Sequence, residues 1–249
     1  MHPDCVGAVE LTGLGLAASV AMVAPYDFVL DRELWRWVPA DTSVLLARTR
    51  HLTLTGGVAQ AHAIADHTGL LELARSVSIL HSPVVGYLCT SASFVDGPAG
   101  ELKLRRLLRG AGFPAAVTTS GALVDALHAL SVHRVAVATP YLGEVTRLLV
   151  DFLAAHGFRV TGSGQLEMGA EIWTTEAAAL RALARRVVTP DAEALFLSCT
   201  NLPSYDQIEI LEDELQIPVL SANQVTMWSC LRAAGRSAVG AGRLLREHP

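Results

Sequence analysis

The chain has 249 residues, of which 51% are hydrophobic, 17% are charged and only 6% are aromatic. A chain this apolar can bury a large core, which excludes a mainly disordered protein. The net charge of −5 and the lack of a basic stripe exclude a typical nucleic-acid binder. A core of aliphatic side chains is typical of parallel strands that are covered by helices on both faces.

Short apolar runs alternate with amphipathic stretches along the chain. We expect strands at 18–23, 43–46, 84–88, 115–117, 134–138, 159–162, 194–197 and 218–220, and helices at 100–111, 120–131, 143–156, 175–188 and 205–216. In the last of these helices Ile208, Leu211 and Leu215 share one face, and Ser204 or Asp206 can cap the start. This alternation predicts parallel sheets with right-handed crossovers.

The sequence contains an internal repeat. Residues 20–27, an apolar run that ends in Pro-Tyr-Asp, match residues 135–142 at an offset of 115. Residues 84–91, an apolar run followed by Cys-Thr-Ser, match residues 194–201 at an offset of 110. A weaker echo relates 114–120 to 218–224.

The repeat predicts an α/β fold of two pseudo-symmetric lobes, each with a parallel four-stranded sheet flanked by helices. We expect the first lobe to span residues 1–116, completed by a C-terminal helix at 224–249, and the second lobe to span 117–223. Because ligands of open α/β sheets bind beyond the carboxyl ends of the strands, the active site is expected in the cleft between the lobes.

Cys89 and Cys199 follow equivalent strands of the repeat. The repeat therefore predicts one thiol from each lobe at a single pocket, where N–H groups at a helix start can lower a thiol pKa and hold an anion. The residues that follow the two cysteines add polar groups: Thr90, Ser91, Thr200 and Asn201. Two opposed thiols allow proton removal on one side of a carbon and return on the other. Alternatively, one thiol adds to an alkene while the second assists.

Other candidate residues receive plainer interpretations. Cys5 and Cys230 are expected to be structural, since a free cysteine is often a small buried hydrophobe. For Tyr26 and Tyr141, at equivalent strand ends, a pocket role and an ordinary packing role are both open. The absence of a CxxC pair, a histidine cluster, a nucleotide fingerprint and a Gly-x-Ser-x-Gly elbow argues against a metal site, a nucleotide cofactor and a serine hydrolase.

The sequence also bears on location and partners. The apolar stretch from Leu14 to Pro25 spans about a dozen residues, too few to cross a bilayer, and no secretory signal is recognised. We therefore expect a cytoplasmic protein with reduced thiols that has neither membrane nor nucleic-acid partners. Its partners are expected to be a small carboxylate substrate and further copies of the same chain.

Several longer motifs identify a family that covers nearly the whole chain. They are Ser198–Leu202, Ile217–Gln224 with Trp228, Cys89–Phe94, Thr118–Ala122 and Thr139–Tyr141. In these motifs the chain resembles the aspartate/glutamate racemase superfamily, and within it the maleate cis-trans isomerase and arylmalonate decarboxylase branch. The stretches Pro25–Phe28 and Leu30–Trp35 are similar to the racemase-like ectoine-utilisation members of this branch.

The resemblance implies a cofactor-independent enzyme with one active site between two lobes. By the maleate isomerase pattern, Cys89 would add to the substrate double bond, Cys199 would act as acid and base, and Tyr141 would bind a substrate carboxylate. The remaining donors to bound anions would be Thr90, Ser91, Thr200 and Asn201. The presence of both cysteines favours isomerisation or racemisation, because the decarboxylases of this branch typically keep only the second.

Two departures from the maleate isomerase pattern concern the substrate. Those enzymes have asparagine where this chain has Asp27, and a second asparagine in the region where this chain has Leu166–Glu171. A carboxylate beside a bound carboxylate is unfavourable unless it is protonated or paired. We therefore place Asp27 in the substrate pocket and expect a small carboxylate, either amino-acid-like or a dicarboxylate, with an amino group favoured.

Two alternatives remain open from the sequence. One is decarboxylation of a substituted malonate by a single thiol, which would release CO₂. The other is a catalytically silent two-lobed binding protein, whose cysteines would react slowly with alkylating reagents at neutral pH.

Overall fold

The computed structural model describes residues 18–53 and 56–249, and in this part of the chain it shows two four-stranded parallel sheets. The first has the order β2-β1-β3-β4, and its strands are β1 (Ala18–Ala24), β2 (Thr42–Arg48), β3 (Val84–Tyr87) and β4 (Ala115–Thr118). The second has the order β6-β5-β7-β8, with β5 (Arg134–Thr139), β6 (Arg159–Gln165), β7 (Ala194–Leu197) and β8 (Val219–Ser221). The shared strand order confirms two pseudo-symmetric lobes.

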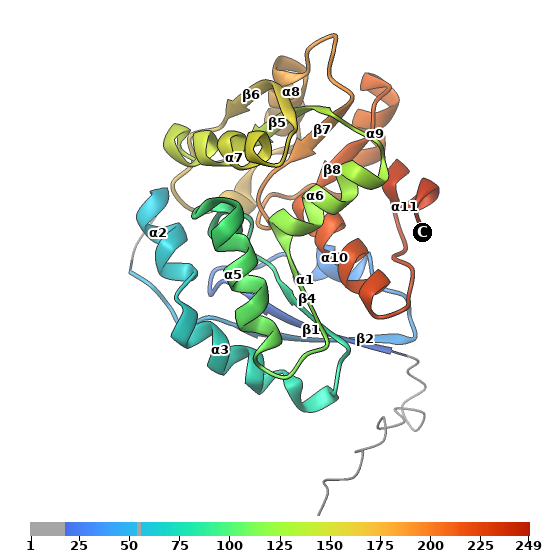
Figure 1. Cartoon of the computed structure of the whole chain (residues 1–249). Helices are drawn as coiled ribbons and strands as arrows, with labels where there is room; N and C mark the ends of the chain where they lie inside the picture. Colours follow the sequence, from blue (N-terminus) through green and yellow to red (C-terminus); the bar gives the residue numbers. More distant parts are fainter. Residues whose placement is uncertain (1–17, 54–55) are drawn as a thin grey trace, which may run out of the picture.

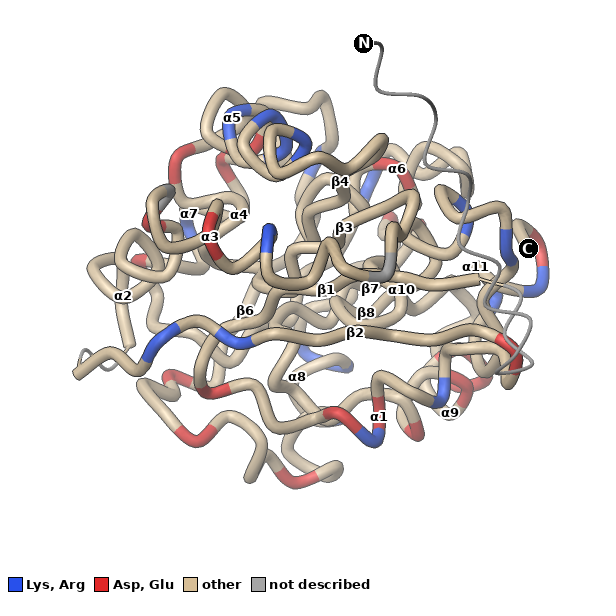
Figure 2. The backbone as a smooth tube through the Cα atoms, turned by 90° about the horizontal axis from the view of Figure 1, so that it is seen from below, with Lys and Arg blue, Asp and Glu red and all other residues tan. Residues whose placement is uncertain are grey.

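Most strands of the two sheets contain no charged residue. Strands β1, β3 and β4 of the first sheet, and β7 and β8 of the second, contain no Lys, Arg, Asp or Glu, while β2, β5 and β6 each carry one arginine at an end; most charged residues lie on helices and loops (Figure 2). Strands buried on both faces cannot solvate a charge, so they consist of aliphatic runs. The outer strands β2 and β6 are only partly buried.

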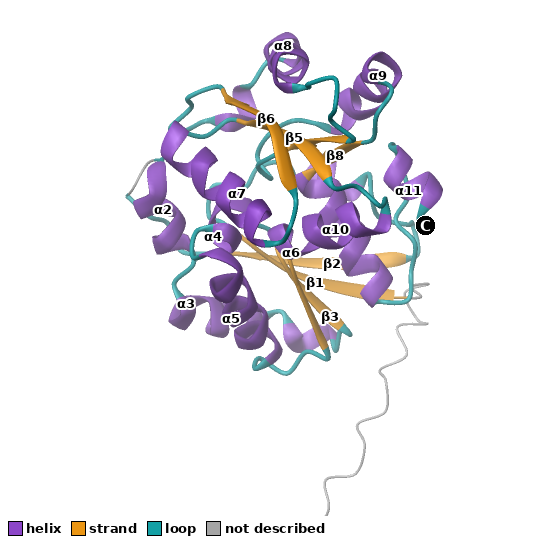
Figure 3. Cartoon of the chain, turned by 45° about the horizontal axis from the view of Figure 1, so that its top comes forward, coloured by secondary structure: helices purple, strands orange, loops and turns teal. Residues whose placement is uncertain are grey.

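The helices surround both sheets. They are α1 (Asp31–Trp35), α2 (Gly57–Ile64), α3 (His67–Ser76), α4 (Thr90–Phe94), α5 (Gly97–Arg109), α6 (Thr119–Ala129), α7 (Gly143–Ala155), α8 (Ala177–Val187), α9 (Tyr205–Leu215), α10 (Ala222–Ala233) and α11 (Arg243–Glu247), with two 3-10 turns, η2 (Ser78–Leu80) and η3 (Ile172–Thr174). Helices α8 and α9 lie outside the second sheet, α3 and α5 outside the first, and α6 and α10 lie between the two sheets (Figures 1 and 3).

Helices α6 and α10 are the equivalent helices that follow the last strand of each sheet. Thr118 Oγ1 accepts a hydrogen bond from the Gly121 N–H (3.0 Å), and Ser221 Oγ accepts one from the Gln224 N–H (3.2 Å), so both helices are capped at their first turn. The Thr226 hydroxyl donates to Thr119 Oγ1 (2.9 Å) and joins the two helices. The weak sequence echo of 114–120 in 218–224 therefore corresponds to a real structural repeat.

The expected single helix at 224–249 is wrong. Helix α10 ends at Ala233 and α11 begins only at Arg243. The connection contains Gly235, Gly240 and Gly242 with φ of +69°, +106° and +110°, which interrupts the helical path. Helix α10 packs against β3 and β4, and β4 ends at Thr118. The lobe boundary after residue 116 stays a prediction.

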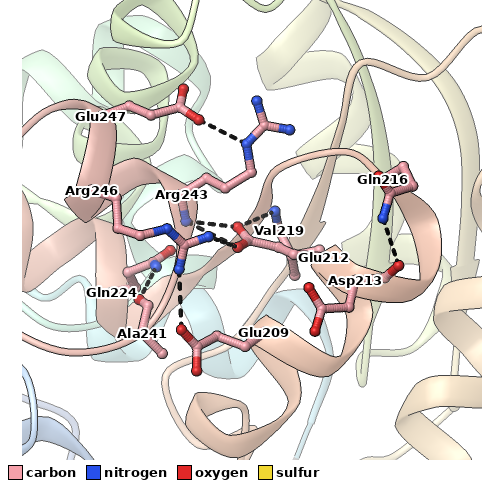
Figure 4. Close-up of polar contacts among 10 residues, drawn as sticks. All are labelled: Glu209, Glu212, Asp213, Gln216, Val219, Gln224, Ala241, Arg243, Arg246 and Glu247. Atoms are coloured by element: carbon pink, nitrogen blue, oxygen red, sulfur yellow. Dashed lines mark hydrogen bonds and ion pairs between the residues drawn. The ribbon is translucent and has the colours of Figure 1, made fainter.

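A buried carboxylate holds α11 against α9 (Figure 4). Glu212 of α9 accepts hydrogen bonds from the N–H groups of Val219 (3.1 Å) and Arg243 (2.9 Å), and it pairs with the Arg246 guanidinium at 3.0 Å. A buried carboxylate is tolerated when donors and an opposite charge surround it. Glu212 therefore fixes the C-terminal segment on the second lobe.

Helix α9 confirms its predicted apolar face but not its predicted cap. Ile208 and Leu211 are fully buried and Leu215 is partly buried. Ser204 occupies the N-cap position, yet its side chain makes no capping bond. Its hydroxyl donates instead to Glu33 Oε1 at 2.9 Å. The Ser204 hydroxyl thus bonds to the distant Glu33 carboxylate, and it does not cap the start of α9 as the local sequence pattern predicted.

Two further expectations can be compared with the described residues. Within 18–53 and 56–249, none of the helices combines the length and the apolar character that crossing a membrane requires. Cys230 is fully buried in α10, as its structural interpretation requires. Cys5 lies outside the described residues.

Strand β3, which leads into Cys89, packs unusually closely against its neighbours at Gly86. A Cβ atom at Gly86 would lie 2.5 Å from Met22 Sδ and 2.7 Å from Cys230 Sγ. Such distances are far inside van der Waals contact, so Gly86 lets the two sulfur atoms approach the strand.

We predict that Gly86→Ala lowers the free energy of unfolding by about 2 kcal/mol, because an overpacked core must shift. Cys230→Ala removes one of the two obstructing atoms, so the double variant should lose less stability than the sum of the single variants. Urea denaturation of the three variants measures this coupling. Strictly additive losses would show that Gly86 does not contact Cys230.

Candidate active site

Both predicted cysteines line one cavity between the lobes. Cys89 follows β3 and Cys199 follows β7, and a cavity of about 60 Å³ at these strand ends is bounded by both. The other six residues predicted for the site line the same cavity: Asp27, Thr90, Ser91, Tyr141, Thr200 and Asn201. The structure therefore brings all eight residues together, although they come from both halves of the chain.

Other walls of the cavity come from segments that the sequence analysis did not single out. Helix α2 contributes Gly57, Gln60, Ala61 and Ile64, and the loop after β6 contributes Met168, Gly169 and Ile172. Gly56 has φ +67°, and a Cβ atom there would lie 2.9 Å from Gly169 Cα. The consecutive glycines at 56 and 57 were the available signal, because two lobes that meet backbone to backbone need residues without side chains.

The two cysteines have different backbone conformations. Cys89 has φ −147° and directly precedes α4. Cys199 has φ +94°, a region that residues other than glycine rarely adopt, and a turn follows it in place of a helix. Such a conformation costs about 1–3 kcal/mol and persists only when the surroundings impose it. The expectation that each thiol precedes a helix start is thus confirmed for Cys89 and wrong for Cys199.

Burial decides the protonation of both thiols. It raises the pKa of Cys89 and of Cys199 to about 12, because a thiolate loses its hydration in the enclosed cavity. Main-chain N–H groups work in the opposite direction, as the sequence predicted. The Asn201 N–H, for example, donates to Cys199 Sγ at 3.4 Å. These bonds do not outweigh burial, so both thiols carry their protons at neutral pH.

The two equivalent tyrosines have diverged. Tyr141 is buried in the cavity, and its hydroxyl accepts a hydrogen bond from Ser198 Oγ at 3.3 Å. Burial raises the pKa of Tyr141 well above 10, so it remains a hydrogen-bond donor. Tyr26 instead accepts a bond from Gln60 Nε2 (3.3 Å) and packs edge-on against His51, with ring centroids 5.1 Å apart. Of the two, Tyr141 lies on the cysteine cavity.

A second hollow of about 150 Å³ adjoins the cysteine cavity. It shares Asp27, Gln60, Gly169, Ile172 and Asn201 with that cavity, and its outer wall consists of Tyr26, Ala170, Glu171 and Trp173. Burial raises the pKa of Asp27 above its usual value. Lys, Arg and His are absent from the residues described as lining either hollow. The two hollows therefore form an acidic region without a compensating positive side chain.

The described residues contain no cluster of three or more His, Cys, Asp and Glu side chains with the geometry of a metal site. The chemistry that this geometry supports is proton transfer or nucleophilic addition by thiols, beside hydroxyl and amide donors. The expectation that no metal or cofactor takes part stays a prediction.

Fold and site together define a two-lobed α/β enzyme with its cavity between the lobes. The family model for arylmalonate decarboxylase matches residues 38–245, and the chain therefore belongs to the arylmalonate decarboxylase family. This confirms the branch that the motifs identified, while the similarity to ectoine-utilisation members is unconfirmed.

Relatives in this family carry two different activities. The chain is 36% identical to a maleate isomerase of Nocardia farcinica over 174 residues, 66% of this chain and 69% of the relative. It is 34% identical to an arylmalonate decarboxylase of Bordetella bronchiseptica over 203 residues, 79% of this chain and 82% of the relative. Such relatives support a cofactor-independent isomerase or decarboxylase of small carboxylates.

Solved structures share the fold. A cysteine-to-serine variant of the Nocardia farcinica maleate cis-trans isomerase, with a covalently bound succinylcysteine intermediate, superposes with a TM-score of 0.84 at 27% identity, covering 93% of this chain and 99% of that one. A double mutant of arylmalonate decarboxylase in its liganded form also gives 0.84, at 30% identity, covering 92% of this chain and 99% of the other.

The positive φ of Cys199 gives a stability prediction. Glycine adopts this region without strain, whereas alanine does not, so Cys199→Gly should be more stable than Cys199→Ala by about 1 kcal/mol. At a helical φ the alanine variant should be the more stable one. The control pair is Thr90→Gly and Thr90→Ala in α4, where we expect the alanine variant to be more stable. Thermal or urea unfolding of the four variants decides, and a less stable glycine variant at 199 would contradict the strained conformation.

Proposed function

We propose that the protein is a cofactor-independent isomerase or racemase that acts on a small carboxylate through Cys89 and Cys199. The observation that carries this proposal is the pair of thiols, one from each lobe, on a single cavity. The relatives named maleate isomerase support it, as does the cysteine-linked intermediate of the Nocardia protein. A small carboxylate is the expected ligand, and a cytoplasmic homo-oligomer is the expected form.

The thiols have complementary roles in this proposal. For an alkene substrate, the sulfur of Cys89 forms a bond to one alkene carbon while its own proton passes to the Cys199 sulfur, and the Cys199 thiol gives its proton to the neighbouring carbon. The C=C bond becomes single and can rotate, and the reverse steps restore it. For a racemase, one cysteine must first become a thiolate and then takes the α proton, while the other cysteine, as a thiol, gives its proton to the opposite face of the same carbon. Both routes need at least one protonated thiol, which burial favours.

Neutral donors would hold the substrate carboxylate. The Tyr141 hydroxyl is buried and protonated, and Thr90, Ser91 and Thr200 line the same cavity. Hydrogen bonds from fixed donors stabilise developing negative charge best in an enclosed site. Tyr141 is therefore the proposed carboxylate ligand, and the hydroxyl residues assist it.

The charge of the two hollows favours an amino-acid-like substrate. Asp27 lies on both hollows and Glu171 lies on the outer one, and the described lining contains no cationic side chain. A dicarboxylate would bring a second anion beside Asp27, whereas an ammonium group would neutralise that carboxylate. A dicarboxylate remains the alternative if Asp27 binds protonated.

Decarboxylation by a single thiol is the second candidate, since the family model and the Bordetella relative carry that name. It differs in releasing CO₂ and in needing only one cysteine. A silent binding protein is the third. Because burial raises both thiol pKa values, slow alkylation is expected of an enzyme as well, so turnover must distinguish these functions.

We predict that Cys89→Ser and Cys199→Ser each reduce turnover by about 1,000-fold or more, as loss of an acid–base or nucleophilic group does. Solvent deuterium incorporation into a panel of small carboxylates, followed by NMR, measures this, and circular dichroism checks folding. Cys230→Ala is the matched control and should retain activity. Full activity in either serine variant would contradict the two-thiol mechanism, and CO₂ release by Cys89→Ser would favour decarboxylation.

We predict that Asp27→Asn changes ligand preference more than stability. Aspartate should bind about tenfold more weakly and succinate more tightly, because the variant loses one negative charge, and tenfold corresponds to ~1.4 kcal/mol. In the native protein, aspartate binding should weaken as the pH falls through the raised pKa of Asp27. The asparagine variant should lack that dependence. Calorimetry over a series of pH values is the measurement, and an unchanged preference would place Asp27 outside the substrate site.

A further inference from the structure

The loop between β7 and α9 carries Cys199 and is held from the opposite lobe. Asn201 Nδ2 donates to the Asp27 carbonyl oxygen at 2.9 Å, and Asn201 Oδ1 accepts from the Val29 N–H at 3.1 Å. Both ends of the amide are therefore bonded to the backbone of the first lobe. The Thr200 hydroxyl adds a longer bond to the Leu88 carbonyl oxygen at 3.4 Å.

Glu33 of α1 fixes the other end of this loop. Its carboxylate accepts from the Ser204 N–H (2.9 Å), from the Ser204 hydroxyl (2.9 Å) and from Asn223 Nδ2 (3.2 Å). Asn223, in the first turn of α10, also donates to the Thr200 carbonyl oxygen at 3.0 Å. One carboxylate thus joins α1, α10 and the Cys199 loop.

These contacts explain how Cys199 keeps an unfavourable φ. The loop cannot relax at Cys199 without moving either Thr200–Asn201 or Ser204, and both are bonded to groups outside the loop. Bonds to a carboxylate are roughly twice as strong as neutral ones, so Glu33 holds the loop more firmly than an amide would. Ser204 gives up its capping role in α9 to join this network.

We propose that Glu33 is a positioning residue that holds the Cys199 sulfur in its working place through Ser204 and Asn223. The inference rests on the proposed function, in which Cys199 is the acid and base of the reaction. Glu33 does not line the cavity, so its effect on chemistry passes through the loop.

The test is the rate of iodoacetamide alkylation at Cys199 against pH, followed by mass spectrometry of the Cys199 and Cys89 peptides in the full chain. In Glu33→Gln the loop should loosen and expose the sulfur, so Cys199 should react about tenfold faster at pH 8 while Cys89 changes less than twofold. Ser204→Ala removes one donor and should give a smaller rise of the same kind, which keeps the test decisive if the first variant does not fold.

Glu212→Gln is the matched control. Glu212 is also a buried carboxylate that accepts hydrogen bonds from main-chain N–H groups, but it holds α11 (Figure 4) and is not among the residues that line the cavity. It should lower the melting temperature without changing either alkylation profile. If Glu33→Gln leaves Cys199 unchanged, or speeds both cysteines equally, Glu33 has only a general structural role. Alkylation needs no substrate, so this result is separate from the turnover test of the two cysteines.

Discussion

The conformation of Cys199 depends on hydrogen bonds that cross from one lobe to the other. A non-glycine residue at φ +94° is held there by Asn201 and Ser204, whose partners are Asp27, Val29 and Glu33. The connection after β1 and the helix α1 therefore hold in place a loop that lies about 170 residues further along the chain. Any movement of one lobe against the other would reach the sulfur through these hydrogen bonds.

Two properties of the cavity bear on its thiols. Burial raises the pKa of both thiols and keeps them protonated, and the described lining lacks a cationic side chain that would stabilise a thiolate. A thiolate is therefore unfavourable there unless neutral donors stabilise it. Protonated thiols favour chemistry in which proton transfer and bond formation are coupled. They also react slowly with oxidants and electrophiles in solution.

Much of the fold followed from the sequence because apolar periodicity and the internal repeat report on burial. All eight strands and five helices lie where the pattern placed them, and the repeat gathered the eight site residues at one cavity. Short helices such as α1 and α4 carry too few residues to show a period. The φ of Cys199, the interrupted C-terminal helix and the diversion of Ser204 to Glu33 depend on tertiary contacts, which a local pattern does not contain.

Duplication produced symmetric sheets but an asymmetric site. Cys89 and Cys199 occupy equivalent strand ends, yet one begins a helix and the other lies in a strained turn. Tyr141 lies on the cysteine cavity, whereas its counterpart Tyr26 lies on the outer hollow. The two thiols are therefore similarly placed but differ in their surroundings. The repeat supplies the placement, and the divergence of the flanking loops supplies the inequality.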